Sequence, residues 1–181
     1  MNTLTFERRT YDARIADDQP VRPYAQSEFV VDGVGLSERF GFEEARPFFG
    51  QTCFEWSAEH LGARALELRG LASARSQLGE GRFVLYGCHC GSDYCGVISC
   101  AITREGGDVI WSDVRHEDAD WSDGEDELEE DDGVDGEDGA MFALRLSELR
   151  FDAASYDDEV ARHVKVALAA AAASEGEVED G

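Results

Sequence analysis

The sequence predicts a single α+β domain, in which an antiparallel β-meander sheet of about five to seven strands packs against a central helical pair and a C-terminal helix. Three observations predict this class. Residues 83–86, 97–103 and 109–114 are rich in β-branched and aromatic residues, and a Glu-Gly-Gly-Asp turn joins the last two. Residues 57–75 carry apolar side chains at helical spacing. Residues 153–173 form an alanine-rich run that follows a capping residue.

The N-terminal part of the chain predicts short strands and turns. Residues 3–15 alternate loosely between apolar and polar side chains, which is typical of one or two short strands with a turn between them. Residues 29–31 are a Phe-Val-Val strand that ends in an Asp-Gly turn. One helical turn is expected directly afterwards, over residues 36–40.

The helical pair is predicted over residues 57–75, where leucine and alanine recur with helical period. Gly62 and Gly70 are the weak points, because glycine in a helix interior is unfavourable by about 1 kcal/mol. We therefore expect the helical segment to be broken near Gly70.

The C-terminal part predicts strands followed by a helix. Residues 142–146 and 149–151 are expected to be strands. Asp152 is expected to cap a helix that runs through the alanine-rich residues to about position 173. Its last residues are expected to fray into a charged tail.

The negative charge of the chain is concentrated in two places. The 181 residues carry a formal net charge of −24, yet fourteen carboxylates and no lysine or arginine lie between Glu117 and Asp138, and four more acids lie in residues 174–181. Without these eighteen, twenty-two acidic residues face sixteen basic ones, a net charge of −6. We therefore expect one domain over residues 1–173, with a disordered acidic loop at 117–139 and a disordered acidic tail at 174–181.

Composition also restricts the partners. No apolar run approaches the roughly 20 residues that span a bilayer, and the N-terminus has no secretory signal, so we expect a cytoplasmic protein without membrane contact. A protein that binds nucleic acid needs a basic groove, whereas the negative electrostatic field of this chain would repel phosphate. A protein partner with a basic surface fits the charge.

The most informative segment is residues 88–100, which holds four of the five cysteines. Cys88 and Cys90 lie two positions apart at a strand end, and Cys95 follows a short turn, so three sulfur atoms can approach one point. A tetrahedral zinc site would use them if a fourth ligand came from elsewhere. Structural packing of the thiols is the favoured interpretation, because the spacing departs from the C-x2-C pairs of common zinc sites.

The fourth ligand is the weak point of the zinc hypothesis. Cys100 alternates with Ile98 and Ile102 and is expected to be a buried core residue. Cys53, His60 and His116 are distant candidates. A redox pair is disfavoured, because the usual dithiol motif is C-x-x-C at the start of a helix.

Patterns typical of enzymes are missing from the sequence. The chain has no H-x-x-x-H pair, no G-x-S-x-G elbow and no glycine-rich phosphate loop before a helix. A calcium-loop pattern begins at Asp118, but Asp123 stands where the loop needs glycine. We therefore predict no catalytic residues and no cofactor, with zinc on the cysteine segment as the alternative.

Three groups of residues resemble a known family. The C-x-C-G-x3-C pattern at 88–95 and the V-I-W-S-D segment at 109–113 are similar to those of a widespread group of small bacterial proteins. Residues 149–152 with Tyr156 resemble the F-D…Y element that precedes the last helix of that group. The resemblance implies an architecture and no activity, because the group has no assigned biochemical function. Gly96 departs from the family pattern, which has an aromatic residue there.

Three functional hypotheses follow. The leading one is a non-enzymatic cytoplasmic protein that binds a partner, with the cysteine segment holding the geometry of the meander. The second is a zinc-binding protein or metalloenzyme that uses Cys88, Cys90 and Cys95. The third places function in the acidic loop, which would dock a basic partner or act as a weak DNA mimic.

Overall fold

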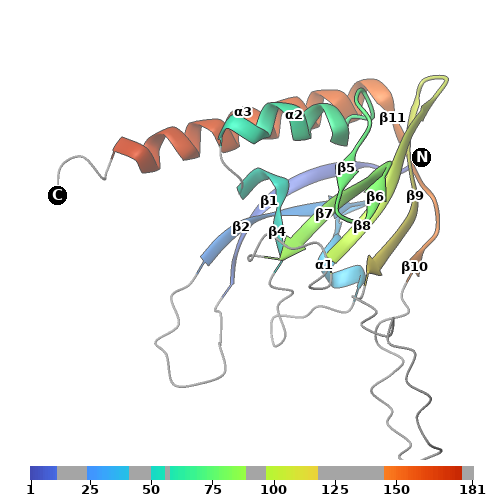
Figure 1. Cartoon of the computed structure of the whole chain (residues 1–181), viewed down its shortest axis with the longest axis horizontal. Coiled ribbons are helices and arrows are strands. Elements are labelled where there is room, and N and C mark those ends of the chain that lie inside the picture. The colour runs from blue at the N-terminus through green and yellow to red at the C-terminus, as the bar shows by residue number, and fades with distance from the viewer. Residues whose placement is uncertain (12–23, 41–49, 56–57, 89–96, 118–144, 177–181) are drawn as a thin grey trace, which may run out of the picture.

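The computed structural model describes residues 1–11, 24–40, 50–55, 58–88, 97–117 and 145–176. It confirms the α+β class. Figure 1 shows two long helices lying together over one face of the β-strands, with the C-terminal helix running the length of the molecule. In the part of the chain that the structure describes, no helix is long and apolar enough to cross a membrane.

The larger sheet contains the predicted meander. Its strand order is β10-β9-β8-β7-β4, and β11 also pairs with β9; all pairings are antiparallel. The bounds are β4 Gly50–Thr52, β7 Arg82–Cys88, β8 Val97–Glu105, β9 Asp108–Glu117, β10 Arg145–Leu146 and β11 Leu149–Asp152. The turn between β8 and β9 has Gly106 at φ 61°, a left-handed conformation that glycine adopts without strain.

The N-terminal strands form a sheet of their own, which the sequence did not predict. This sheet has the order β1-β2-β3 and comprises β1 Leu4–Tyr11, β2 Tyr24–Val31 and β3 Val34–Gly35. The prediction of one sheet of about five to seven strands is therefore wrong: the strands are divided between separate sheets, and their number differs from the predicted one. Residues 26–31 of β2 are buried without exception, so neighbouring elements cover both faces of this strand.

The junction between the two sheets is made by side chains. The Phe29 amide donates a hydrogen bond to the Tyr86 hydroxyl at 3.1 Å, and that hydroxyl donates to Oε1 of Glu28 at 2.9 Å. The Ser37 amide and hydroxyl also donate to this carboxylate at 2.9 Å each. Since Glu28 is fully buried, these bonds offset the cost of removing its oxygen from water.

The Asp-Gly turn after β2 is confirmed. Asp32 has φ 53° and Gly33 has φ 79°, the pair of left-handed residues that a tight hairpin turn requires. The Asn2 side chain and the Thr3 amide each donate to the Asp32 carboxylate at 2.7 Å, and these bonds lower the pKa of that group. The predicted helical turn follows as α1, Leu36–Arg39.

The predicted helical pair is a single α-helix, α2, Ala58–Leu68. A 3₁₀ turn, η1 (Cys53–Glu55), precedes it, and the hairpin of β5 (Arg75–Ser76) and β6 (Gly79–Glu80) follows it. Gly70 ends the helix at φ 65°, where its amide bonds to the Glu67 carbonyl and the Leu71 amide bonds to the Leu66 carbonyl. This is a Schellman C-cap, so the predicted break near Gly70 is a helix end and the second helix does not form.

The C-terminal helix α3, Ala153–Gly176, has the predicted cap. The backbone amide and the hydroxyl of Ser155 both donate to Oδ1 of Asp152 at 2.9 Å, and these bonds lower the pKa of the aspartate. The helix continues to Gly176, past the predicted start of the acidic tail. Similarly, Glu117 belongs to β9 and not to the predicted loop; residues 118–139 and 177–181 lie outside the described residues.

A buried hydrogen-bonded chain fastens both long helices to the larger sheet. The indole N–H of Trp111 on β9 donates to the Tyr156 hydroxyl of α3 at 3.0 Å, and this hydroxyl donates to the Leu68 carbonyl of α2 at 2.8 Å. The Trp111 ring also contacts Phe151 and Phe29, at centroid distances of 5.2 and 5.7 Å. Trp111 and Tyr156 therefore lie at the centre of the core.

The first residues of the chain meet strand β11 beside this core. Asn2 forms a parallel β-bridge with Phe151. The backbone amide of Asn2 donates to the Arg150 carbonyl at 2.7 Å, and the backbone amide of Arg150 donates to the side-chain oxygen of Asn2 at 2.9 Å. The outer edge of β1 is bonded as well, because the Phe6 amide donates to the Glu159 carboxylate of α3 at 3.0 Å.

We predict that Tyr156→Phe lowers the free energy of unfolding by about 3 kcal/mol, because it leaves the Trp111 N–H and the Leu68 carbonyl buried without a partner. Urea unfolding of the single variants and of the double variant with Trp111→Phe measures this. A coupling energy of about 1 kcal/mol is expected, since the two substitutions break one shared bond. Strictly additive effects would contradict the role assigned to the hydroxyl.

Candidate functional site

The cysteine segment begins where the meander turns. Cys88 is the last residue of β7 and pairs in register with Gly50 of β4, while Cys90 and Cys95 lie outside the described residues. Among the residues that the structure describes, no three His, Cys, Asp or Glu side chains form a group that could hold a metal ion. The zinc hypothesis for Cys88, Cys90 and Cys95 therefore stays a prediction.

The distant ligand candidates lie in different parts of the fold. Cys53 is 2% exposed, and burial raises the pKa of its thiol to about 12, which disfavours the thiolate that a metal needs. His60 lies on the exposed side of α2. His116 lies on β9 and pairs in register with Ile98, one residue after the start of β8. Only His116 among the three is at the meander end that carries the cysteine segment.

Cys100 is a core residue, as predicted. It is fully buried among the apolar side chains of the core, and burial raises the pKa of its thiol well above the usual range. A thiol in this setting packs as a small apolar side chain.

An ionic network joins the three strands β7, β8 and β9 of the meander. Arg82 of β7 contacts the Asp113 carboxylate at 2.8 Å and the Glu117 carboxylate at 2.6 Å, and the Ser99 hydroxyl also donates to Glu117 at 2.6 Å. Arg115 contacts both acids, at 3.1 and 3.0 Å. Burial alone would raise the pKa of Glu117, but the bonds from Ser99 and Arg115 and the nearby Arg82 charge hold it below the usual value.

Asp113 occupies an unusual backbone position in this network. The register of β8 and β9 shifts between Ser99 and Ala101, because β9 has one extra residue there, and Asp113 has φ 50°. A β-bulge with a left-handed residue aims that side chain away from the regular ladder, toward Arg82 and Arg115. Two guanidinium groups and two carboxylates balance each other, so this network has a structural role and holds β7, β8 and β9 together.

A second polar cluster joins α3 to the smaller sheet. The His163 imidazole lies 2.8 Å from the Ser27 hydroxyl of β2, is stacked on Phe6 at 4.5 Å, and meets Phe54 edge-on at the same distance. The Ser27 amide and hydroxyl donate to the Glu55 carboxylate at 2.8 and 3.1 Å. A serine and a histidine in hydrogen-bond contact are the two central members of a nucleophilic site.

The cluster lacks the remaining properties of such a site. Ser27 is 2% exposed and His163 is 5% exposed, so a substrate cannot reach the hydroxyl. Glu55 accepts from the serine and does not orient the imidazole. Burial, followed by the charge of Arg162, lowers the pKa of His163 to about 4. We conclude that the cluster is a buried polar contact that sets the position of α3.

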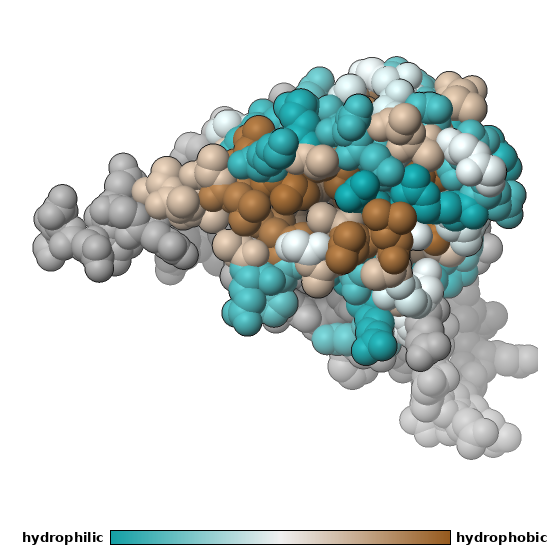
Figure 2. Space-filling view, turned by 90° about the horizontal axis from the view of Figure 1, so that it is seen from above, coloured by the Kyte–Doolittle hydropathy of each residue, from teal (hydrophilic) through white to brown (hydrophobic). Residues whose placement is uncertain are grey.

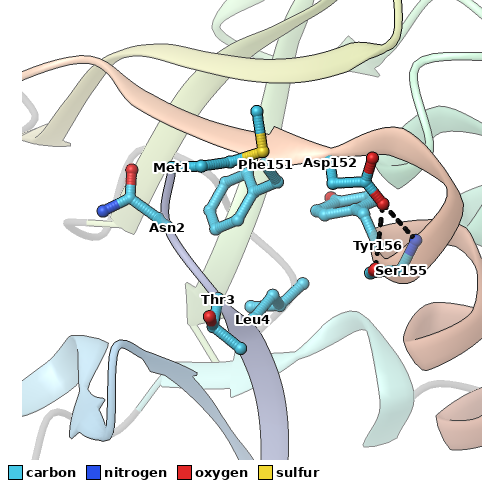
Figure 3. Close-up of a pocket in the computed structure, with 8 residues that line it drawn as sticks. All are labelled: Met1, Asn2, Thr3, Leu4, Phe151, Asp152, Ser155 and Tyr156. Atoms are coloured by element: carbon cyan, nitrogen blue, oxygen red, sulfur yellow. Dashed lines mark hydrogen bonds between the residues drawn. The ribbon is translucent and has the colours of Figure 1, made fainter.

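A pocket of about 260 Å³ opens beside the start of α3. Its lining comes from the first residues of the chain and from the β11–α3 corner: Met1, Asn2, Thr3, Leu4, Phe151, Asp152, Ser155 and Tyr156. Figure 3 shows that the Asp152 carboxylate already receives both Ser155 bonds. The serine hydroxyl and the carboxylate that line the pocket are therefore already engaged with each other in capping α3.

The helical layer, formed by α2, the turn after it and α3, carries exposed apolar side chains. Of six large hydrophobic residues that are exposed in the described part of the chain, four belong to this layer: Leu66, Leu71, Val166 and Leu168. Figure 2 looks onto the layer and shows apolar residues gathered along it between polar ones. Sequence analysis missed this surface, because an alanine-rich helix fits either a core or a surface position.

Comparisons of the chain with protein-family models, with curated proteins and with solved structures found no match.

We predict that the free energy of unfolding falls by about 2 kcal/mol between pH 7.5 and pH 5, because of His163. Its pKa is lowered from 6.5 to about 4 in the fold, so the unfolded chain takes up a proton near pH 6.5 while the folded chain does not. Stability is thus lost as the pH falls from about 6.5 toward 4. Denaturation over this range measures the slope.

The matched controls for this prediction are His163→Gln and His60→Gln. The first removes the titrating imidazole and is expected to flatten the slope, whereas the second removes an exposed imidazole on α2 and leaves the slope intact. Measurements stay above pH 5, where carboxylates with lowered pKa such as Asp157 are ionised in both states. An unchanged slope in His163→Gln would refute the assignment.

Proposed function

We propose that this protein is a non-enzymatic binding protein that holds a partner protein with a basic surface on its helical layer. One observation carries the proposal: the exposed large apolar side chains concentrate on this layer, at Leu66, Leu71, Val166 and Leu168. Contiguous apolar surface on a folded protein marks an interaction site more often than scattered exposed residues do.

The second half of α3 supports this proposal most strongly. Residues 166–173 are apolar without exception, and most of them are exposed, with Val166 at 50% and Leu168 at 40%. A helix that is apolar on all sides is normally buried. In Figure 1 this half of α3 continues past α2, toward the C-terminus. A partner would supply the cover that the rest of the fold does not.

The charge of the chain supports a basic partner. A net charge of −24 attracts positively charged surfaces and repels phosphate, so it disfavours nucleic acids and anionic lipid surfaces. The closed Ser27–His163 contact and the compensated Arg82 network offer no reacting groups to a substrate. Binding without turnover is the activity that these features support best.

The resemblance to the small bacterial group stays a proposal, and the roles of its residues limit what it implies. Trp111 and Tyr156 fasten α3 to the sheet, and Asp152 caps that helix. Residues with such structural roles indicate a shared fold, so the resemblance by itself does not imply a shared activity.

The test is affinity capture with the full-length protein, Leu168→Glu and the control Val34→Glu, which adds the same charge at an exposed apolar residue outside the layer. We expect a basic protein to be retained by the native protein and by the control. Calorimetry with that purified protein should then show binding at least about ten-fold weaker to Leu168→Glu, equivalent to about 1.4 kcal/mol. Equal affinity for both variants would overturn the proposed surface.

Zinc binding at the cysteine segment is the second candidate function. The position of His116 favours it, since His116 lies beside the start of β8 and could supply the fourth ligand to Cys88, Cys90 and Cys95. This candidate does not exclude a binding role, because a metal-held corner can also be structural.

Native mass spectrometry with elemental analysis, on untagged protein purified without chelator, tests the zinc candidate. It predicts one zinc per chain, lost in Cys95→Ser and in His116→Ala but retained in His60→Ala. Metal-free protein that is fully folded would refute it and leave the cysteines a packing role.

A further inference from the structure

We infer that the partner places an Asp or Glu carboxylate on Arg69 at the end of α2, with an apolar side chain beside it on Leu66 and Leu71. The inference rests on the proposed docking function and adds one specific contact to it. The contact lies at the corner where α2 ends against α3 and β8 (Figure 1). The net charge of the chain attracts a partner that is basic overall, whereas this one carboxylate determines where the partner sits.

Two arginines share one carboxylate at this corner. Nε of Arg69 lies 3.0 Å from Oδ1 of Asp157, and the Arg104 guanidinium donates to both oxygens of the same group at 3.1 and 3.0 Å. Burial alone would raise the pKa of Asp157, but the bonds from Arg104 and Arg69 hold it below its usual value. The aspartate is therefore ionised, and two positive charges face one negative charge, which leaves a net charge of +1.

The outer end of the Arg69 guanidinium is available to a partner. Within the described part of the chain, its Nη1 and Nη2 atoms have no hydrogen-bond or ion-pair partner, and the side chain is 29% exposed. A planar guanidinium binds a carboxylate through two parallel N–H···O bonds, which these two nitrogens can donate. Neighbouring acids do not occupy them, because Glu67 is bound by Arg64 and the described contacts include no ion pair from Asp158 to Arg69.

The Arg69 side chain is held in position before a partner binds. Its Nε is fixed by Asp157, and its backbone carbonyl accepts from Arg104 at 2.7 Å. Gly70 lies directly on the Arg104 side chain, since a Cβ at this position would come within 3.2 Å of Arg104 Cγ. Little conformational entropy is therefore lost when the guanidinium receives a carboxylate.

The C-terminal end of a helix normally disfavours an anion, because its last carbonyl groups carry a partial negative charge. At the end of α2 these carbonyls already accept hydrogen bonds. The donors are the Leu71 amide to Leu66, the Gly70 amide to Glu67, the Tyr156 hydroxyl to Leu68 and the Arg104 guanidinium to Arg69. Exposed charges beyond about 8 Å are screened at physiological ionic strength, so the two guanidinium groups dominate the local field.

Two exposed leucines provide the apolar half of the contact. Leu66 is 45% exposed and Leu71 is 52% exposed. The Leu71 amide bonds to the Leu66 carbonyl at 2.9 Å, in a C-cap whose side chains at these two positions commonly pack against each other. Leu66 also precedes Arg69 by three positions, the spacing of neighbours on one side of a helix. One short segment of a partner can therefore reach the leucines and the guanidinium together.

The experiment titrates isotope-labelled full-length protein with the blocked dipeptide acetyl-leucyl-glutamate amide. NMR follows the backbone amides of Leu66 and Leu71 and the Nε–H of Arg69, and we expect saturable shifts with a dissociation constant in the millimolar range. Two matched dipeptides, with glutamine in place of glutamate or alanine in place of leucine, are expected to bind about ten-fold more weakly. Equal binding of either one would overturn the inference.

Variants of the protein locate the carboxylate. Arg69→Gln is expected to weaken binding about ten-fold, and Arg69→Lys, which keeps the charge without the paired donors, is expected to weaken it less. Arg75→Gln removes the same charge from an exposed arginine of β5 and is expected to change affinity by less than about two-fold. Circular dichroism checks the fold, since Asp157 keeps Arg104 in all three variants. Equal losses in Arg69→Gln and Arg75→Gln would contradict the assignment.

Two further ligands test the source of the anion. Tighter binding of N-acetylleucine than of the glutamate dipeptide would replace the acidic side chain with a C-terminal carboxylate and overturn the inference. Tighter binding of inorganic phosphate, lost in Arg69→Gln, would overturn it as well. These outcomes are separate from the capture experiment, which depends on Leu168, so the docking function can stand when this contact fails.

Discussion

The architecture depends on one hydroxyl group. Tyr156 accepts from the Trp111 indole and donates to the Leu68 carbonyl, so a single buried oxygen connects a sheet strand to two helices. Outside the core, Asp157, the next residue, binds Arg69 at the end of α2 and Arg104 of β8. Because the hydroxyl and the carboxylate act on the same turn of α3, the helix has one direction and one rotation on the sheet. The exposed apolar residues of its second half follow from that rotation.

Local chemistry explains which parts of the fold could be predicted. The meander, the Asp-Gly turn and the Asp152 cap each depend on residues close in sequence, and all three are present. The packing of a second sheet on the first was not predictable, because it depends on a bond between Glu28 and Tyr86, which are 58 positions apart. Gly70 illustrates an intermediate case: the break was predicted, but glycine alone does not tell whether another helix follows.

The candidate site was harder to predict than the fold. His163 and Ser27 are 136 positions apart, and neither neighbourhood in the sequence contains a motif. His163 does follow Tyr156 and Val160 at helical spacing, a pattern that predicts a buried face but gives no partner. The exposed surface of α3 was missed for a related reason, since alanine is compatible with burial and with exposure. The metal hypothesis mainly concerns residues that the structure does not describe, so zinc binding by Cys88, Cys90 and Cys95 remains a prediction from the sequence.

The bridge between Asn2 and Phe151 has a consequence for synthesis of the chain on the ribosome. The Asn2 side chain bonds to the backbone of Arg150, 148 positions later, and β11 joins the same sheet as β9. The start of the chain therefore has to remain without this partner until about 148 further residues have been translated. At roughly 5–20 residues per second, that delay lasts about 7 to 30 seconds. Until then the start of the chain lacks this bond, whereas the Asp32 turn between β2 and β3, to which Asn2 and Thr3 donate, needs only N-terminal residues and can form early.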